Sequence, residues 1–238
     1  MVKPPVGEIW KSEMARTSGA RSKAPLSKDR VVRAAIALAD KEGLEALTMR
    51  KLAQGLGVEA MSLYHHVSNK EAILNEMVDW IFGEFRLPTT EEPWKETLRA
   101  RAISAHDVLV SHPWAIHVIE TRRDPGPLTL QHHEAVLACL RHGGFSVPLT
   151  AHAYALLDSH IYGFVMQEMT LPFRTYEEVE ELAEHILAQM PEELFPSFTE
   201  LTREYILKPG YAYANEFAFG LDLILDGLER AKESEQMT

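Results

Sequence analysis

Residues 49–71 read MRKLAQGLGVEAMSLYHHVSNKE, and this stretch decides the fold that the sequence predicts. A short basic helix ends at the glycine pair Gly55 and Gly57, and a second short helix with an aromatic residue and two histidines follows it. Gly57 can adopt the left-handed backbone conformation of a tight turn without steric cost. Two short helices joined in this way predict a helix-turn-helix, which presents its second helix to the major groove of DNA.

The residues of the motif separate into an inner and an outer set. We expect five apolar residues to pack the two helices together: Leu52, Ala53, Leu56, Val58 and Leu63. Polar side chains remain outside as donors to phosphates or base edges: Arg50, Ser62, Tyr64, His66 and Lys70. On the glycine turn alone, a surface helix pair in an ordinary bundle is the alternative.

The flanking sequence predicts further helices. SKDRVVRAAIALADKEG has one apolar face with a helical period and ends at Gly43. Ser68 and Glu71 form an S-x-x-E capping box before a helix that ends near residue 86. Beyond LPTTEEP, helices are expected at about 93–112, 127–142, 148–170, 175–189, 197–207 and 212–233, with capping boxes at Thr175/Glu178 and Ser197/Glu200. With no strand-like alternation, the predicted fold class is all-α.

The charge of the chain is unevenly distributed. The total is −11, but residues 1–72 hold 12 Lys+Arg against 8 Asp+Glu, a net of +4, and residues 73–238 hold 12 against 27, a net of −15. Because salt screens charges beyond about 8 Å, a basic head on an acidic body can still bind nucleic acid. We predict three parts: a flexible basic arm at 1–25, a DNA-binding domain at 26–86 and a second domain at 87–238.

The composition also indicates the cellular compartment in which the protein is expected to act. No apolar run reaches the roughly 18 residues that cross a bilayer, and the N-terminus lacks the apolar stretch of a signal peptide. The single cysteine, Cys139, agrees with a reducing environment. We therefore expect a cytoplasmic protein.

The stretch LTMRKLAQGLGVEAMSLYHHVSNKEAIL resembles the DNA-binding head of TetR-family transcriptional regulators. Weaker similarity to the tetracycline-repressor branch continues through EPWKETLRARAISAHDVLVSHP, RHGGFS and EFAFGLDLILDGLE. The resemblance implies a three-helix head that continues through a fourth helix into a ligand-binding and dimerising body. It implies operator contacts at Thr48, Arg50, Ala60, Met61, Ser62, Tyr64, His66 and Lys70. Ala60 and Met61 stand where the tetracycline repressors have glutamine and proline, so Ala60 offers only a methyl contact to a base.

The last helix is apolar on two faces. Phe217, Leu221, Ile224 and Leu228 form one stripe, and Phe219 and Leu223 form another. A helix with two apolar faces needs two partners, its own core and a second copy, which favours an isologous homodimer. The resemblance implies that this helix and the one near 148–170 pair with their symmetry mates.

The eleven histidines do not predict a metal site. None are three or four residues apart, Cys139 stands alone, and no catalytic or nucleotide-binding motif occurs, so we predict neither a cofactor nor an enzyme. A site assembled from distant histidines such as His106, His117 and His160 remains an alternative. Tetracycline-binding members use a histidine and a glutamate with magnesium, and the aligned positions here hold Val118 and Gln167, so no magnesium–tetracycline complex is predicted.

A pocket for a small amphipathic compound is expected between residues 93–112, 113–121, 127–142 and 148–170. The candidate ligand contacts are Arg101, His117, Arg122, His160, Phe164 and Gln167, although each also suits a packing or surface role. The sequence thus predicts a ligand-responsive DNA-binding repressor of transcription. A ligand-blind dimeric regulator and a helical small-molecule enzyme are the rival hypotheses.

Overall fold

The computed structural model describes residues 25–122 and 124–237, and in these ranges the chain contains helices and no strands. The all-α prediction is confirmed. The basic arm predicted at 1–25 lies almost entirely outside the described residues. The helices are α2 (Lys28–Glu42), η1 (Leu44–Ala46), α3 (Met49–Leu56), α4 (Ala60–Leu63), α5 (Lys70–Glu84), α6 (Trp94–Ser111), α7 (Ile116–Ile119), α8 (Pro127–His142), α9 (Val147–Thr170), α10 (Tyr176–Gln189), α11 (Pro196–Leu201), the π-helical turn η2 (Thr202–Ile206) and α12 (Asn215–Gln236).

The head consists of α2, α3 and α4 and forms as the sequence predicts. Thr48 caps α3 by accepting a hydrogen bond from Lys51 N at 3.2 Å. Gly57 ends α3 with φ 68° and ψ 36°, a left-handed conformation that strains residues with a side chain. Leu52, Ala53 and Leu63 are buried between the helices, as expected, while Leu56 and Val58 are partly buried.

Two of the three predicted capping boxes are wrong. Helix α5 begins one residue later than predicted, because Asn69 Oδ1 accepts from Ala72 N at 2.8 Å and takes the capping role assigned to Ser68. Helix α11 begins at Pro196, whose fixed φ suits a first helical turn, and Ser197 does not cap it. The box of Thr175 and Glu178 is confirmed in both directions.

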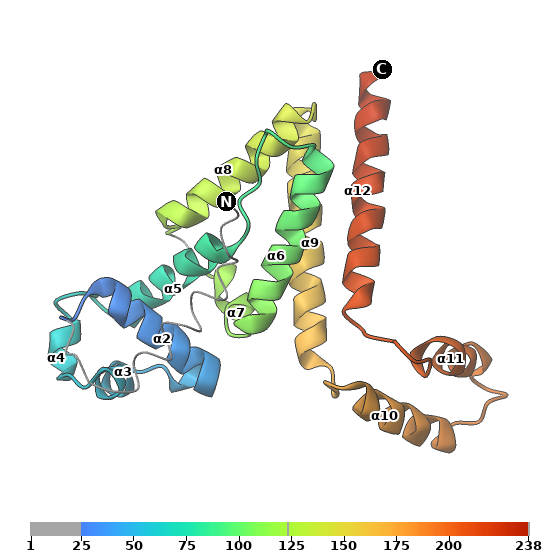
Figure 1. The fold of residues 1–238 in the computed structure, drawn as a ribbon, viewed down its shortest axis with the longest axis horizontal. Helices are drawn as coiled ribbons and strands as arrows, with labels where there is room; N and C mark the ends of the chain where they lie inside the picture. The colour runs from blue at the N-terminus through green and yellow to red at the C-terminus, as the bar shows by residue number, and fades with distance from the viewer. Residues whose placement is uncertain (1–24, 123, 238) are drawn as a thin grey trace, which may run out of the picture.

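In the body, α6, α7 and α8 contact α5, α9 packs against α6 and α8, and α12 packs on the far side against α6 and α9 (Figure 1). Helices α9 and α12 run side by side on the face away from the head, and α10 and α11 project beyond them. Lys95 and Arg99 of α6 form ion pairs with α12, the latter to Asp222 at 2.6 Å. None of the described helices is long and apolar enough to cross a membrane.

Candidate functional site

The outer face of the head carries the predicted DNA contacts. Thr48, Arg50, Met61 and Tyr64 are exposed, and Ala60, Ser62, His66 and Lys70 are half-buried. The side chains of Arg50, Tyr64, His66 and Lys70 form no hydrogen bond or ion pair with any described residue. Lys51, by contrast, is paired with Glu42. The face therefore offers uncommitted donors of the kind that bind phosphates and base edges, although their contacts with DNA remain predictions.

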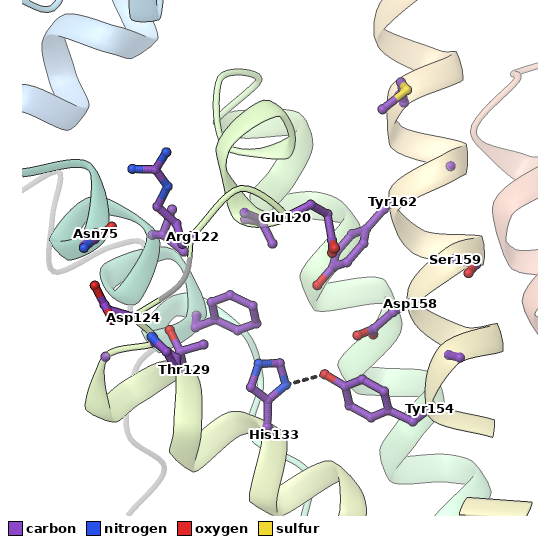
Figure 2. A pocket seen from close by; sticks show the side chains of 18 residues that line it. Asn75, Glu120, Arg122, Asp124, Thr129, His133, Tyr154, Asp158, Ser159 and Tyr162 are labelled. Atoms are coloured by element: carbon purple, nitrogen blue, oxygen red, sulfur yellow. Dashed lines mark hydrogen bonds between the residues drawn. The ribbon is translucent and has the colours of Figure 1, made fainter. Parts of the chain in front are cut away.

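The body contains a cavity of about 840 Å³, within the range of pockets for drug-sized ligands. Its walls come from α5, from the segment that joins α7 to α8, and from α8 and α9 (Figure 2). Apolar side chains on these elements include Val78, Phe82, Ile119 and Met166. Polar side chains gather on the α8 and α9 walls, where Tyr154, Asp158 and Tyr162 are spaced four residues apart on one face of α9.

Two separate sets of hydrogen-bonded, partly or fully buried groups support the polar wall. The Tyr154 hydroxyl is bonded to His133 Nδ1, and Arg101 Nη1 donates to Asp158 at 2.8 Å. Arg101 Nε donates to His132 Nε2 at 3.0 Å, so His132 accepts there and is neutral. Burial, with a smaller effect of the Arg101 charge, lowers the pKa of His132 to about 3.

The same wall keeps His133, Tyr154 and Tyr162 uncharged near neutral pH. Burial lowers the pKa of His133, against an opposing effect of Asp158. Burial is also the main cause that raises the pKa of Tyr154 and Tyr162 above the usual range of a phenol, and Asp158 adds to both shifts. Neutral donors and acceptors of this kind can orient a ligand through hydrogen bonds.

The cavity wall is attached to α5, the helix that leads into the head. Arg122, which lines the cavity, pairs with Glu71 in the first turn of α5 at 2.6 Å. Two turns later, buried Asp79 accepts from the backbone N of Thr129 at 2.8 Å and from its hydroxyl at 2.9 Å. Asp79 thereby caps the start of α8. A β-carbon on Gly126 would lie 2.3 Å from Asp79 Cγ, so the segment between α7 and α8 approaches α5 as closely as a glycine permits.

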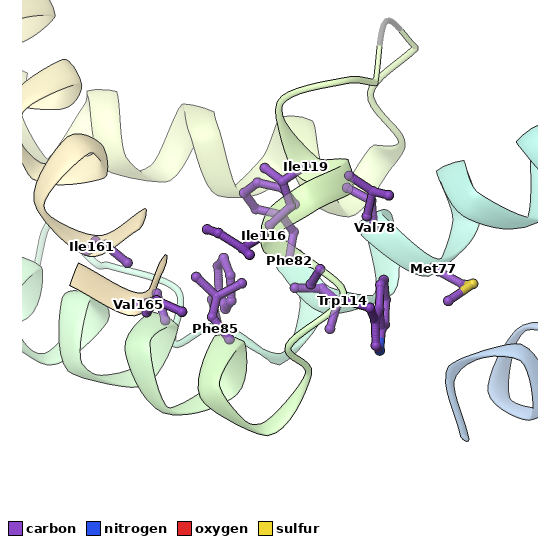
Figure 3. Packing of buried hydrophobic residues seen from close by; sticks show 14 of the residues in the cluster. Met77, Val78, Phe82, Phe85, Trp114, Ile116, Ile119, Ile161 and Val165 are labelled. Atoms are coloured by element: carbon purple, nitrogen blue, oxygen red, sulfur yellow. The ribbon is translucent and has the colours of Figure 1, made fainter. Parts of the chain in front are cut away.

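Helix α5 contributes buried residues to the core of the head and to the core of the body. Ile73 and Met77 belong to the same buried cluster as Val32 and Leu63 of the head. In Figure 3, Phe82 and Phe85 lie among Ile116, Ile161 and other residues of the body. A second link joins α2 to the end of α6, because Asp40 accepts from Trp114 Nε1 at 2.6 Å and is bonded to His112 Nδ1 at 2.8 Å. The head and the body are therefore connected through the core around α5 and through the contacts of Asp40.

Most of the predicted ligand contacts lie outside the cavity lining. Of the six, Arg122 lines the cavity and the other five are not among its lining residues. Arg101 is buried behind the wall, where it is held by Asp158, and His117 is exposed. Gln167 is also exposed and accepts from the Tyr213 hydroxyl at 3.0 Å, so these residues serve packing or surface roles in this structure.

The histidines proposed as an alternative metal site do not converge. His106 and His160 stack on Phe217, at centroid distances of 4.4 and 5.0 Å, while His117 is on the surface. His106 is also bonded to Glu168 at 2.8 Å. Across the described ranges, no group of three or more His, Cys, Asp or Glu side chains is arranged to hold a metal ion.

Sequence reasoning missed most of the cavity. It did not single out Glu120, Asp124, His133, Tyr154, Asp158 or Tyr162, all of which line it. The spacing of Tyr154, Asp158 and Tyr162 was a detectable pattern, since polar residues four apart share a face of an otherwise apolar helix. Their positions opposite α5 depend on contacts between distant segments, which periodicity does not reveal.

Known proteins match both parts of the chain. Residues 31–77 match the family described as "Bacterial regulatory proteins, tetR family", and residues 87–231 match "Tetracyclin repressor-like, C-terminal domain". The HTH-type transcriptional regulator of Saccharopolyspora erythraea is 37% identical over 77% of this chain and 77% of its own length. The HTH-type transcriptional repressor DrrR1 of Streptomyces coeruleorubidus is 32% identical over 93% of this chain and 83% of its own.

Solved structures agree with this similarity. The crystal structure of apo ActR from Streptomyces coelicolor superposes with a TM-score of 0.72 at 27% identity, covering 89% of this chain and 99% of that one. The structure of ActR in complex with actinorhodin also gives 0.72, at 28% identity, over 88% and 99% of the two chains.

Proposed function

The chain belongs to the tetR family of bacterial regulatory proteins, and from this premise we propose that it is a homodimeric repressor of transcription. Its two recognition helices bind a near-palindromic operator, and a small molecule in the body releases it. The observation that carries the proposal is the double attachment of the cavity wall to α5, through Arg122 to Glu71 and through Thr129 to Asp79.

The attachment gives the effector a path to the DNA. A ligand that spreads the wall moves the segment that includes Arg122 and Thr129, and α5 moves with it. Because α5 shares a core with the head, the distance between the two recognition helices of the dimer changes. DNA and effector then weaken each other's binding reciprocally, by a coupling of about 1–3 kcal/mol.

The dimer supplies the spacing that the operator requires. Phe219 and Leu223 of α12 are 64% and 55% exposed, and Leu156 of α9 is 45% exposed, on helices that lie next to each other. Large exposed apolar side chains on adjacent helices favour a contact with a second copy. Two heads related by that contact bind half-sites about one turn of DNA apart, or a multiple of it.

The remaining features agree with a regulator that acts in the cytoplasm. The division at residues 86 and 87 separates the DNA-binding and ligand-binding parts, and the sequence before the head contributes the positive residues Lys11, Arg16, Arg21 and Lys23. Val118 is buried and Gln167 is bonded to Tyr213, so this site does not suit the magnesium–tetracycline complex of the tetracycline repressors. The effector is therefore a different compound, and the body has no enzymatic role.

Selection of binding sites from random DNA by the purified full-length chain tests this proposal. We expect an inverted repeat, bound by a dimer, which is then released by compounds that raise the melting temperature of the free protein. A monomer without sequence preference contradicts DNA regulation altogether. A dimer with a defined operator that no stabilising compound releases supports the ligand-blind alternative.

A further inference from the structure

The charges of the cavity are not balanced. Asp158 is neutralised by Arg101 at 2.8 Å, and Arg122 is neutralised by Glu71 at 2.6 Å. Glu120 and Asp124 also line the cavity, and neither has a hydrogen bond or ion pair with any residue that the structure describes. The unpaired charges that a ligand meets from these described residues are therefore both negative.

We infer that the effector is a cation that consists of an apolar, aromatic body and a protonated amine, and that Glu120 is the partner of the amine. This inference rests on the proposed function. Neither the sequence of this chain nor the names of its relatives identify the chemical class of its effector. The cavity restricts it through charge and through the rings that line it.

Glu120 is placed to receive the amine. It follows the last residue of α7, and in Figure 2 it lies beside Tyr162, on the same side of the cavity as Asp158. Its charge raises the pKa of His133, Tyr154 and Tyr162, a minor effect beside burial but one that places all three within its electrostatic reach. An amine at Glu120 would thus also lie among aromatic rings, whose faces attract cations.

Apolar residues from three helices suit the apolar body. Val78 and Phe82 of α5, Ile119 of α7 and Met166 of α9 provide aliphatic and aromatic surface within the same cavity. A flat ring system packed against Val78 and Phe82 leaves an amine substituent free to reach Glu120. The cavity volume of about 840 Å³ accommodates several fused rings together with such a substituent.

Anionic compounds meet two obstacles. A carboxylate in the cavity is repelled by Glu120 and Asp124, and both nearby guanidinium groups are already paired with a carboxylate. To gain Arg122 it would have to displace Glu71, which leaves that carboxylate without its partner. Neutral compounds avoid the repulsion but offer no partner to the exposed Glu120 carboxylate.

Probe sets that differ only in charge test the inference. Each set has one aromatic body, naphthalene, anthracene or pyrene, and carries an aminomethyl group, its N-acetyl amide or a carboxylic acid. Binding to the full-length protein is measured by fluorescence titration and by the shift in melting temperature. We expect each amine to bind about tenfold or more tightly than its amide, and the acid to bind weakest.

Variants locate the charge partner. Glu120→Gln should weaken amine binding by about tenfold and leave the amides unchanged, and Glu120→Lys should reverse the preference in favour of the acids. Glu134→Gln, an exposed carboxylate on α8 outside the cavity lining, is the matched control and should bind like the wild type.

The outcomes separate this inference from the proposed function. If amides or acids bind as tightly as amines, or if Glu120→Gln leaves amine affinity intact, the cation assignment is overturned. Release of the operator by those compounds would still support a ligand-responsive repressor. If no probe binds or releases DNA, both the cation assignment and the role of the cavity are contradicted.

Discussion

Arg122 and Glu71 are 51 positions apart in the sequence, yet their side chains meet at 2.6 Å and join the effector cavity to the first turn of α5. Glu71 follows Lys70, a predicted operator contact, so the pair links a ligand-facing group to the edge of the DNA-binding surface. The Arg122 side chain is 16% exposed and that of Glu71 is 69% exposed, so solvent weakens their attraction.

A double-mutant cycle measures this link. Glu71→Gln and Arg122→Gln should each destabilise the protein slightly, and together by less than the sum, with a coupling of about 0.5–1 kcal/mol in urea unfolding. The single variants should also raise the concentration of effector needed to release the operator, because movement of the cavity wall is then transmitted to α5 less completely. Additive effects on stability would show that the pair carries no coupling.

Lys70 and Tyr64 should each contribute to operator binding. Lys70→Ala removes one phosphate contact and should reduce the slope of log affinity against log salt by about one. Tyr64→Ala should weaken binding by about tenfold without unfolding the protein, since Tyr64 is 46% exposed. Lys208→Ala, an exposed lysine far along the chain from the head, is the control and should keep the wild-type slope. If both head variants retain full affinity, the docking of α4 is incorrect.

The exposed stripe of α12 should hold the dimer together. Leu223→Asp places a charge in the proposed interface and should give a monomer in light scattering at micromolar concentration. Operator affinity should fall about a hundredfold or more, because the two heads are no longer joined in one dimer and must bind the two half-sites independently. Leu130→Asp changes a side chain of similar exposure, 54%, on α8 and should remain dimeric. A dimeric Leu223→Asp protein would place the interface elsewhere.

His132 should make stability sensitive to acid. Its pKa is lowered from 6.5 to about 3 by burial, so the folded protein keeps it neutral while the unfolded chain takes up a proton below about pH 6.5. Stability is therefore lost as pH falls from about 6.5 toward 3, with a slope of up to about 1.4 kcal/mol per unit from this group.

The His132→Gln variant tests the assignment, because its amide oxygen can still accept from Arg101 but does not titrate. Urea unfolding between pH 7 and 4.5 should show a shallower loss of stability than the wild type shows. His185→Gln, an exposed histidine on α10, should keep the wild-type slope. An unchanged slope in His132→Gln would assign the acid sensitivity to other groups.

Local patterns predicted the helices well, and long-range pairing explains the errors. The periodic apolar residues of α2 and the glycine turn at Gly57 act within a few residues, so they were visible in the sequence. Glu71 matched a capping box by spacing, but its carboxylate pairs with Arg122 instead. The sequence also could not show that Arg101, predicted as a ligand contact, pairs with Asp158, 57 positions away.

The shared core of α5 bears on the construction of biosensors from this protein. A chimera that joins its head to a foreign sensing body must take α5 with one parent or the other, because Ile73 faces the head and Phe82 the body along a single helix. A junction between Asp79 and the end of α5 separates Glu71 and Asp79 from Arg122 and Thr129. Such a hybrid would fold and bind its operator, yet respond to no inducer until the acceptor body is given an arginine and a threonine at matching positions.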